Sequence, residues 1–418
     1  MGNEEKGKIL STIRVLDFGR VIAAPFCTRM LSDLGAEVIK IETGDGDPLR
    51  THPPYKNGFG AIFTQYNVGK KSICVDLRNP KGLELTKKLV AVSDVVVENF
   101  RPGVIAKMGL DYSVLKQINP RIILCSISGF GQTGSERDRI AYADIIHARS
   151  GLEYLAAKMM GPGADPPGLP YSFADSYGAL NATIAILAAL LHRQVSGEGQ
   201  AIDISLLDSV LGANDDTLQS FIFSDGALDT PVIPRAPFRM KNGSMAISVV
   251  MAFKRVIIAM DRPELLMDER FKTEEVRLKK ENFDQFLKIV RDWAKTVTVE
   301  EASDLFRRYE VPCAKVNSLA EIVNEPVLRE RKMLVEMELA PSAPPVLVLN
   351  TPVRFSQCLT GPQSRPPHRG EHNQAVFGDL LGFKKDEIRK FLEEGILSHE
   401  ETKTKNEFRR VDNAAALS

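Results

Sequence analysis

Residues 13–42 read IRVLDFGRVIAAPFCTRMLSDLGAEVIKIE, and this stretch decides the fold. The apolar run at 13–18 predicts a buried strand, and residues 36–42 predict a second one. Between them, residues 25–35 predict a helix, because Pro25 suits a first helical turn and Gly35 suits a helix end. A strand, a helix and a strand of these lengths indicate a βαβ unit with parallel strands. The connection in such a unit is nearly always right-handed.

The same alternation continues along the chain on the C-terminal side of this unit. Further strands are expected at 71–77, 94–100, 121–131 and 200–205, and helices at 79–93, 112–120, from near Asp175 to about Gln194, and at 206–223. Strands that alternate with helices favour an α/β fold with a parallel sheet. We therefore expect a Rossmann-like, doubly wound large domain that binds its ligand at the carboxyl ends of the strands.

Two turn-rich or Pro-rich connectors divide the rest of the chain and enclose a smaller α+β domain. The expected organisation is a large domain at 8–222, a linker at 223–236, a small domain at 237–338, a linker at 339–352, a C-terminal part of the large domain at 353–398 and a disordered tail at 399–418.

Composition excludes some classes of partner. The 418 residues contain 54 Lys and Arg and 54 Asp and Glu, so the formal charge is zero. A neutral chain does not favour nucleic acid or an anionic membrane as its main partner. The five cysteines form no C-x-x-C pair, and the polar N-terminus holds no signal-peptide core. The longest apolar run, ATIAILAALL, has ten residues. We expect a cytoplasmic protein that does not insert into a membrane.

Several motifs of known chemistry are missing. The turn after the first strand lacks G-x-G-x-x-G, and the chain has no P-loop and no G-x-S-x-G elbow. His368 and His372 lie four apart in PPHRGEH, but prolines and a glycine indicate a loop there rather than a helix that carries ligands. We therefore expect no metal site.

Basic residues recur where predicted strands end. Arg20 follows the first strand, Arg78 follows the strand at 71–77, and Arg101 and Lys107 follow the strand at 94–100. A polyanion such as a nucleotide phosphate would bind this arrangement. Each residue alone is better explained as a solvated surface charge, and it is their recurrence at one edge of the sheet that indicates a binding site.

Asp175 stands at the start of the long apolar helix and has two interpretations. Asp favours helix N-termini, and SFAD fits a capping box with Ser172 as the cap. The alternative is a reactive carboxylate of an enzyme. The local sequence leaves both open.

Five stretches together resemble the family III CoA-transferases, a family that also includes α-methylacyl-CoA racemases. These are residues 13–42, KKSICVDLRNPKG at 70–82, residues 94–134, SGEGQAIDISLLDS at 196–209 and PPHRGEH at 366–372. The resemblance implies a large domain built from both chain ends, an inserted small domain and an interlocked homodimer. It also implies that HRGEH is a sequence hallmark rather than a metal site.

The family pattern implies roles for individual residues. Asp175 takes the place of the nucleophile, which would form a mixed anhydride and then an aspartyl-CoA thioester. The substrates would be an acyl-CoA and a free carboxylic acid, dicarboxylates among them, with no permanently bound cofactor. The implied CoA contacts are Arg20, Ile22, Ala23, Leu77, Arg78, Asn99, Phe100, Arg101, Lys107 and Arg139.

Two other functions stay open: a CoA-ester isomerase or racemase, and a non-catalytic CoA-binding protein. Racemases of this superfamily carry a histidine immediately before an aspartate, whereas this chain has Ala143 before Asp144. That difference favours transfer over epimerisation. His147, one helical turn further on, is expected to be a packing residue. Arg235 or Arg239 is a candidate partner for a second substrate carboxylate.

Overall fold

The computed structural model describes residues 7–161, 163–213, 217–227 and 237–400. The described residues form two compact units. Unit 1 takes its residues from 1–156, 165–214 and 329–418, and unit 2 takes its residues from 157–164 and 215–328. The expected linker at 223–236 lies largely outside the described residues, and so does the expected tail from 401 onward.

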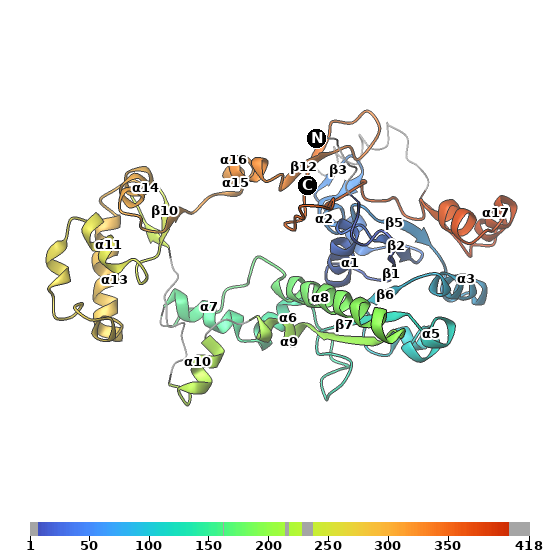
Figure 1. The fold of residues 1–418 in the computed structure, drawn as a ribbon, viewed down its shortest axis with the longest axis horizontal. Helices are drawn as coiled ribbons and strands as arrows, with labels where there is room; N and C mark the ends of the chain where they lie inside the picture. Colours follow the sequence, from blue (N-terminus) through green and yellow to red (C-terminus); the bar gives the residue numbers. More distant parts are fainter. Residues whose placement is uncertain (1–6, 162, 214–216, 228–236, 401–418) are drawn as a thin grey trace. The chain divides into compact units, whose positions relative to one another are not determined.

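A six-stranded parallel sheet forms the centre of unit 1 (Figure 1). The strand order is β5-β2-β1-β6-β7-β8. In chain order this is the 3-2-1-4-5-6 arrangement of doubly wound folds, with the direction of winding reversing between β1 and β6. The predicted α/β class and parallel sheet are thus confirmed. The strands are β1 (Arg14–Asp17), β2 (Glu37–Glu42), β5 (Lys71–Cys74), β6 (Val95–Glu98), β7 (Ile123–Ser128) and β8 (Ala201–Ser205).

Two separate apolar clusters cover the two faces of this sheet. Val15 of β1 belongs to one cluster and its neighbour Leu16 to the other, because successive side chains of a strand point to opposite faces. The first cluster packs α1 (Ala23–Asp33), α6 (Ala143–Arg149), α8 (Phe173–Ser196) and α9 (Leu206–Gly212), and the second packs α3 (Pro80–Ala91), α5 (Tyr112–Ile118) and α17 (Lys385–Glu393). Helices therefore bury both faces, which explains why β6 and β7 are buried at every position.

Shorter elements complete unit 1. They are η1 (Pro48–Thr51), β3 (Tyr55–Lys56), β4 (Phe59–Gly60), α2 (Ala61–Asn67), α4 (Val104–Lys107), β12 (Leu334–Met337), β13 (Val346–Leu349) and η3 (Gln374–Leu380). α7 (Leu152–Met160) runs from the range of unit 1 into that of unit 2. β13 pairs antiparallel with β12, so part of the range expected as the second linker is a strand.

The HRGEH box covers the edge of the sheet at β5. The backbone N–H of His372 donates to the Ser72 carbonyl at 2.8 Å, and the Ser72 N–H donates to Nδ1 of His372 at 3.2 Å. The Asn373 side chain accepts from the Cys74 N–H at 3.1 Å. Among the described residues no group of three or more metal-ligating side chains is present. The box therefore satisfies strand groups that an open edge would expose.

A network of buried charges lies beneath the turn that follows β1. Nζ of Lys70 donates to Asp17 at 2.8 Å, to the Pro25 carbonyl at 2.9 Å and to the Asn67 side chain at 3.0 Å. Nζ of Lys40 donates to the Gly19 carbonyl at 2.7 Å. Asp17, Lys40 and Lys70 are each at most 2% exposed. Every charge in this network is paired or hydrogen-bonded, as burial requires.

α8 is longer than the ten-residue apolar run suggested. Its 24 residues are apolar enough to cross a membrane by length and composition alone. However, 44% of its most apolar window is buried inside the protein, and the helix packs against α1, α9 and β7. Core packing therefore accounts for part of its apolar composition.

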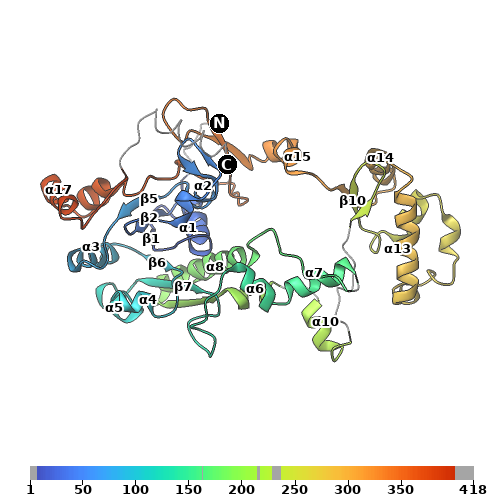
Figure 2. The same cartoon turned by 180° about the vertical axis from the view of Figure 1, so that it is seen from behind.

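Unit 2 has its own core. Its strands form an antiparallel sheet in the order β11-β10-β9, and the rings of Phe253, Phe271 and Phe286 pack with centroids 4.8–6.5 Å apart. Its elements are α10 (Thr217–Phe223), β9 (Phe238–Arg239), β10 (Ser244–Ile247), α11 (Phe253–Ala259), η2 (Pro263–Leu266), α12 (Glu274–Arg277), α13 (Lys280–Ala294), α14 (Val299–Arg308), β11 (Cys313–Lys315) and α15 (Leu319–Val323). α16 (Pro326–Glu330) runs from the range of unit 2 into that of unit 1. Figure 2 shows these elements from behind.

The buried network predicts a large difference between two neighbouring lysines. Lys70→Met should lower the free energy of unfolding by about 3–5 kcal/mol, because it leaves the Asp17 carboxylate buried without its main partner. The matched control is Lys71→Met, which removes a half-exposed ion pair with Glu37. It should cost less than about 1 kcal/mol. Urea denaturation measures both, and equal losses would contradict the assigned role of Lys70.

Candidate active site

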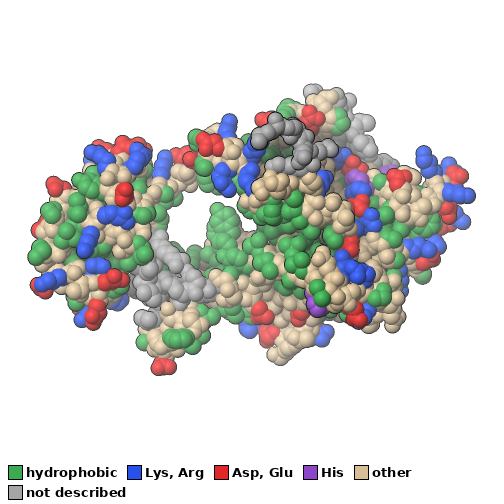
Figure 3. All heavy atoms as spheres, in the orientation of Figure 1, with side chains coloured by type: hydrophobic (Ala, Val, Ile, Leu, Met, Phe, Trp, Pro, Cys, Tyr) green, Lys and Arg blue, Asp and Glu red, His purple; other side chains and the backbone are tan. Residues whose placement is uncertain are grey.

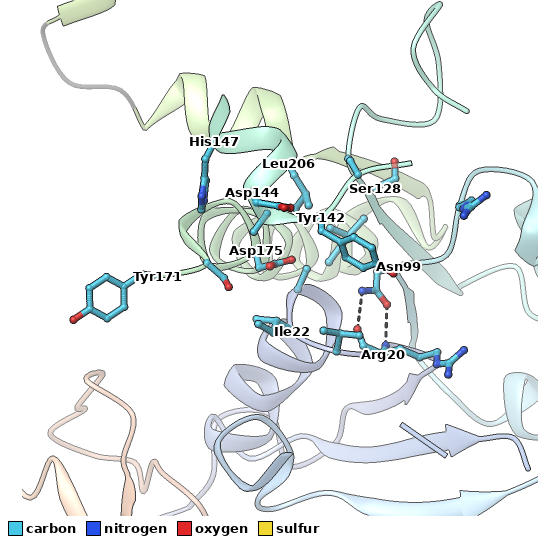
Figure 4. Close-up of a pocket in the computed structure, with 18 of the residues that line it drawn as sticks. Arg20, Ile22, Asn99, Ser128, Tyr142, Asp144, His147, Tyr171, Asp175 and Leu206 are labelled. Atoms are coloured by element: carbon cyan, nitrogen blue, oxygen red, sulfur yellow. Dashed lines mark hydrogen bonds between the residues drawn. The ribbon is translucent and has the colours of Figure 1, made fainter. Parts of the chain in front are cut away.

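A cavity of about 650 Å³ opens in unit 1 where β1, β6 and β7 end (Figure 4). This is the switch point of the sheet, where doubly wound proteins bind their ligands. Five segments line the cavity: the turn after β1, the turn after β6, the end of β7, the first turns of α6, and the start of α8 with the loop before it. They contribute residues 20–23, 99–101, 127–129, 141–144, 147, 169–172 and 175, together with Pro48 and Leu206.

The turn after β1 is held in one conformation from several sides. The backbone N–H of Arg20 donates to the Asn99 side chain, and the Asn99 amide donates back to the Arg20 carbonyl, both at 2.9 Å. Val21 has a φ of +65°, a region that β-branched residues rarely adopt. A Cβ at Gly19 would lie 2.6 Å from the Cβ of Ala24, so this position requires glycine. Such strain persists only where the surroundings impose it, which is a common property of binding sites.

Asp175 is the third residue of α8, and its side chain faces the cavity (Figure 4). Burial raises the pKa of this carboxyl to about 6. Within the described part of the chain, no hydrogen bond or ion pair engages its oxygens. A group with that pKa is mostly ionised at pH 7. The carboxylate is therefore mostly charged and poorly solvated.

The start of α8 is capped differently from the sequence-based prediction. Ser172 is the N-cap residue, but its side chain makes no cap hydrogen bond, so the predicted capping box is wrong. The acceptor comes from α6 instead: Nε2 of His147 accepts the backbone N–H of Ala174 at 3.1 Å. His147 is buried, as expected of a packing residue, and it also makes this specific bond.

The residues expected to contact CoA divide into two groups. Arg20, Ile22, Ala23, Asn99, Phe100 and Arg101 line the cavity together with Asp175. Leu77, Arg78, Lys107 and Arg139 are not among its lining residues. The Arg78 side chain is 92% exposed and pairs with Asp76, and Arg139 pairs with Glu136 at 2.8 Å. A role for these four in binding CoA stays a prediction.

Other cavity residues were not singled out from the sequence as site residues. Ser128, Tyr142 and Tyr171 line the cavity, and no sequence signal identifies them. Asp144 also lines the cavity. From the sequence it served only to locate Ala143, the residue before it, at the position of the racemase histidine. Tyr66 of α2 lies close enough to Asp175 to respond to its charge, since burial first and the Asp175 charge second raise the pKa of the phenol.

Comparison with known proteins agrees with this geometry. A family model described as CoA-transferase family III matches residues 10–373. The chain belongs to CoA-transferase family III. This match confirms the family that the sequence motifs indicated. As a member of that family, the protein is a CoA-transferase.

Two of its relatives are named for transfer from succinyl-CoA. The chain is 33% identical to succinyl-CoA:glutarate CoA-transferase of Mus musculus, over 95% of this chain and 92% of that protein. It is also 33% identical to the β subunit of succinyl-CoA–L-malate CoA-transferase of Chloroflexus aurantiacus, over 91% of this chain and 96% of that subunit. A crystal structure of a CAIB/BAIF family protein from Brucella suis superposes with a TM-score of 0.78 at 32% identity, covering 90% of this chain and 100% of that one.

The two arginines of the cavity should act mainly on binding. Arg20→Ala and Arg101→Ala should each raise the KM for a CoA ester by about 10- to 150-fold, since a lost charge-assisted contact to a phosphate costs about 1.5–3 kcal/mol. The control is Arg121→Ala, an exposed arginine before the opposite end of β7, which should leave KM unchanged. Steady-state kinetics at fixed acceptor concentration checks this. Unchanged KM values for both cavity variants would refute the placement of the nucleotide.

Proposed function

We propose that the protein transfers CoA from an acyl-CoA to a free carboxylic acid with Asp175 as the covalent nucleophile. The observation that carries this proposal is the Asp175 carboxylate, which lines the cavity, has no hydrogen-bond or ion-pair partner among the described residues and has a pKa raised by burial. A raised pKa makes a carboxylate more basic than an ordinary one, and a value of about 6 still leaves most of it ionised near neutrality.

The reaction proceeds in balanced steps. The Asp175 carboxylate attacks the thioester carbonyl and expels CoA thiolate, which leaves a mixed anhydride. The thiolate then attacks the Asp175 carbonyl, releases the donor acid and forms aspartyl-CoA. The acceptor acid reverses both steps and leaves as a new thioester. The thioester energy is retained throughout, provided that water does not reach the anhydride.

The two ends of the cavity suit the two ends of an acyl-CoA. In Figure 4 the Arg20 side chain points away from Asp175, and both residues line the same cavity. The charged phosphates would lie toward Arg20 and Arg101, and the thioester would lie over Asp175. This arrangement needs no metal or permanently bound cofactor.

We infer that the donor is succinyl-CoA or a similar ester and that the acceptor is a small dicarboxylic acid. The support comes from the relatives, whose names pair succinyl-CoA with glutarate or L-malate. Of the candidate partners for a second carboxylate, Arg239 is an exposed residue of β9 in unit 2, and Arg235 lies outside the described residues.

The isomerase alternative gains no support from the cavity. Epimerisation needs an acid and a base on opposite sides of the α-carbon. The position of the racemase histidine is occupied by Ala143, and Nε2 of the cavity residue His147 is already engaged by the Ala174 N–H.

Replacing Asp175 by Asn tests the mechanism. Asn keeps the shape of the side chain and removes the attacking oxygen, so CoA transfer should fall at least about 10³-fold while the CoA ester still binds. With acyl-CoA donor alone, hydroxylamine should convert Asp175 of the wild type to a hydroxamate, which peptide mass spectrometry detects. The Asn variant should yield no hydroxamate. A wild-type transfer rate in Asp175→Asn would rule the mechanism out.

We also propose that the protein is an interlocked homodimer, as the family resemblance implies. α8 leaves Leu180, Ile184, Leu191 and Val195 exposed, and apolar side chains gather over the middle of unit 1 in Figure 3. Interlocked chains separate only by unfolding, so tagged and untagged dimers should exchange no faster than they unfold. Rapid exchange in native buffer, or a monomer at micromolar concentration, would contradict this assembly.

A further inference from the structure

The first turn of α8 depends on a side chain from another helix. The N–H of Phe173 donates to the Tyr171 carbonyl at 3.0 Å, and the N–H of Ser176 donates to the Ser172 carbonyl at 3.0 Å. Between them, the Ala174 N–H donates to Nε2 of His147. The Ser172 side chain, which would ordinarily cap this end, is not used. His147 therefore fixes the backbone one residue before Asp175.

This contact defines the protonation state of His147. A nitrogen that accepts a hydrogen bond carries no proton, so the neutral imidazole must hold its proton on Nδ1. The ring is 3% exposed, and its centroid lies 6.1 Å from that of Phe173. The imidazole is thus enclosed on the side of α8.

The charges around His147 come from three helices. Asp144 and Arg149 lie on its own helix α6, Glu153 lies on α7, and Asp175 lies on α8. Burial lowers the pKa of His147, and Glu153 and Asp144 oppose that shift. The neutral form is therefore favoured near pH 7.

We propose that His147 is a positioning residue that aligns the Asp175 carboxylate by accepting the Ala174 N–H. The inference rests on the proposed function, because alignment matters to catalysis only if Asp175 reacts. An imidazolium has no free lone pair, so protonated His147 cannot accept the Ala174 N–H. Its own Nε2–H would face that N–H, and the first turn of α8 would lose the hydrogen bond. Misplacing a reacting group by about 1 Å costs about 100-fold in rate.

Three substitutions separate an acceptor from a packing residue. The Gln side chain carries its terminal oxygen as far from the backbone as Nε2, so His147→Gln keeps the acceptor but does not titrate. Asn reaches only as far as Nδ1, so His147→Asn keeps polarity and loses the bond. His147→Phe keeps the ring and loses the bond.

The kinetic test compares these variants with the wild type. His147→Asn and His147→Phe should lower kcat by about 10- to 100-fold and change the KM for the CoA ester less than about twofold. His147→Gln should stay within about threefold of the wild-type kcat. In the acid range, log(kcat/KM) should fall with a slope approaching 2 for the wild type, since Asp175 and His147 both titrate, and with a slope of 1 for His147→Gln.

A second readout does not depend on activity. Hydrogen–deuterium exchange of the peptide that covers Tyr171–Ser176 should be faster in His147→Asn and His147→Phe and unchanged in His147→Gln. If the wild type transfers no CoA, the proposed function fails, but this exchange pattern still decides whether His147 holds the helix. Should His147→Phe fail to fold, the Asn and Gln pair gives the answer. The proposal is wrong if His147→Asn has the same kcat as the wild type, the same slope of log(kcat/KM) in the acid range and the same rate of hydrogen–deuterium exchange.

Discussion

The ion pair between Asp17 and Lys70 is the constraint on which the site depends. Asp17 ends β1, and besides Lys70 it accepts from the Thr28 hydroxyl and the Gly19 N–H. The same network reaches the carbonyls of Gly19 and Pro25, which flank the cavity-lining turn. A pair this deeply buried adds little net stability, but losing one partner is costly. It therefore fixes the conformation of the turn, including the strained backbone of Val21, rather than simply adding free energy.

Topology brings the rest of the site to this turn. Because the winding of the sheet reverses between β1 and β6, the turns after these strands diverge and leave a crevice at their carboxyl ends. α8 presents Asp175 to that crevice from the face that carries α1. Its carboxylate owes its raised pKa to burial, since no opposite charge among the described residues stabilises the ionised form. One group thus combines the raised basicity that the proposed nucleophile needs with ionisation at neutral pH.

Sequence reasoning succeeded where the signal is local or recurs along the chain. The six strands of the parallel sheet follow from apolar runs and helix-stop residues, whereas the short strands β3 and β4 were not predicted. The cations Arg20 and Arg101 follow from their positions after strands. The capping box at Ser172 was wrong because a distant acceptor, His147, replaced the local one. The pairing of Lys70 with Asp17 spans 53 residues, and Asn99 with Arg20 spans 79, so no local pattern indicates either. β13 was not predicted, because it lies in a Pro-rich stretch. Its pairing partner, β12, lies in the range that was predicted as the small domain.

Oxygen exchange through Asp175 tests the central claim most directly. In the proposed sequence, the acceptor acid attacks aspartyl-CoA and leaves one of its own oxygens on the Asp175 carboxyl group. A single turnover with an acceptor acid labelled with ¹⁸O in its carboxylate should therefore add about 2 Da to the Asp175 peptide, and later turnovers should pass ¹⁸O to the released donor acid, at most one atom in each molecule. An unlabelled Asp175 after many turnovers, with CoA transferred at the normal rate, would show that the carboxylate never becomes covalently bonded to substrate and would contradict the account.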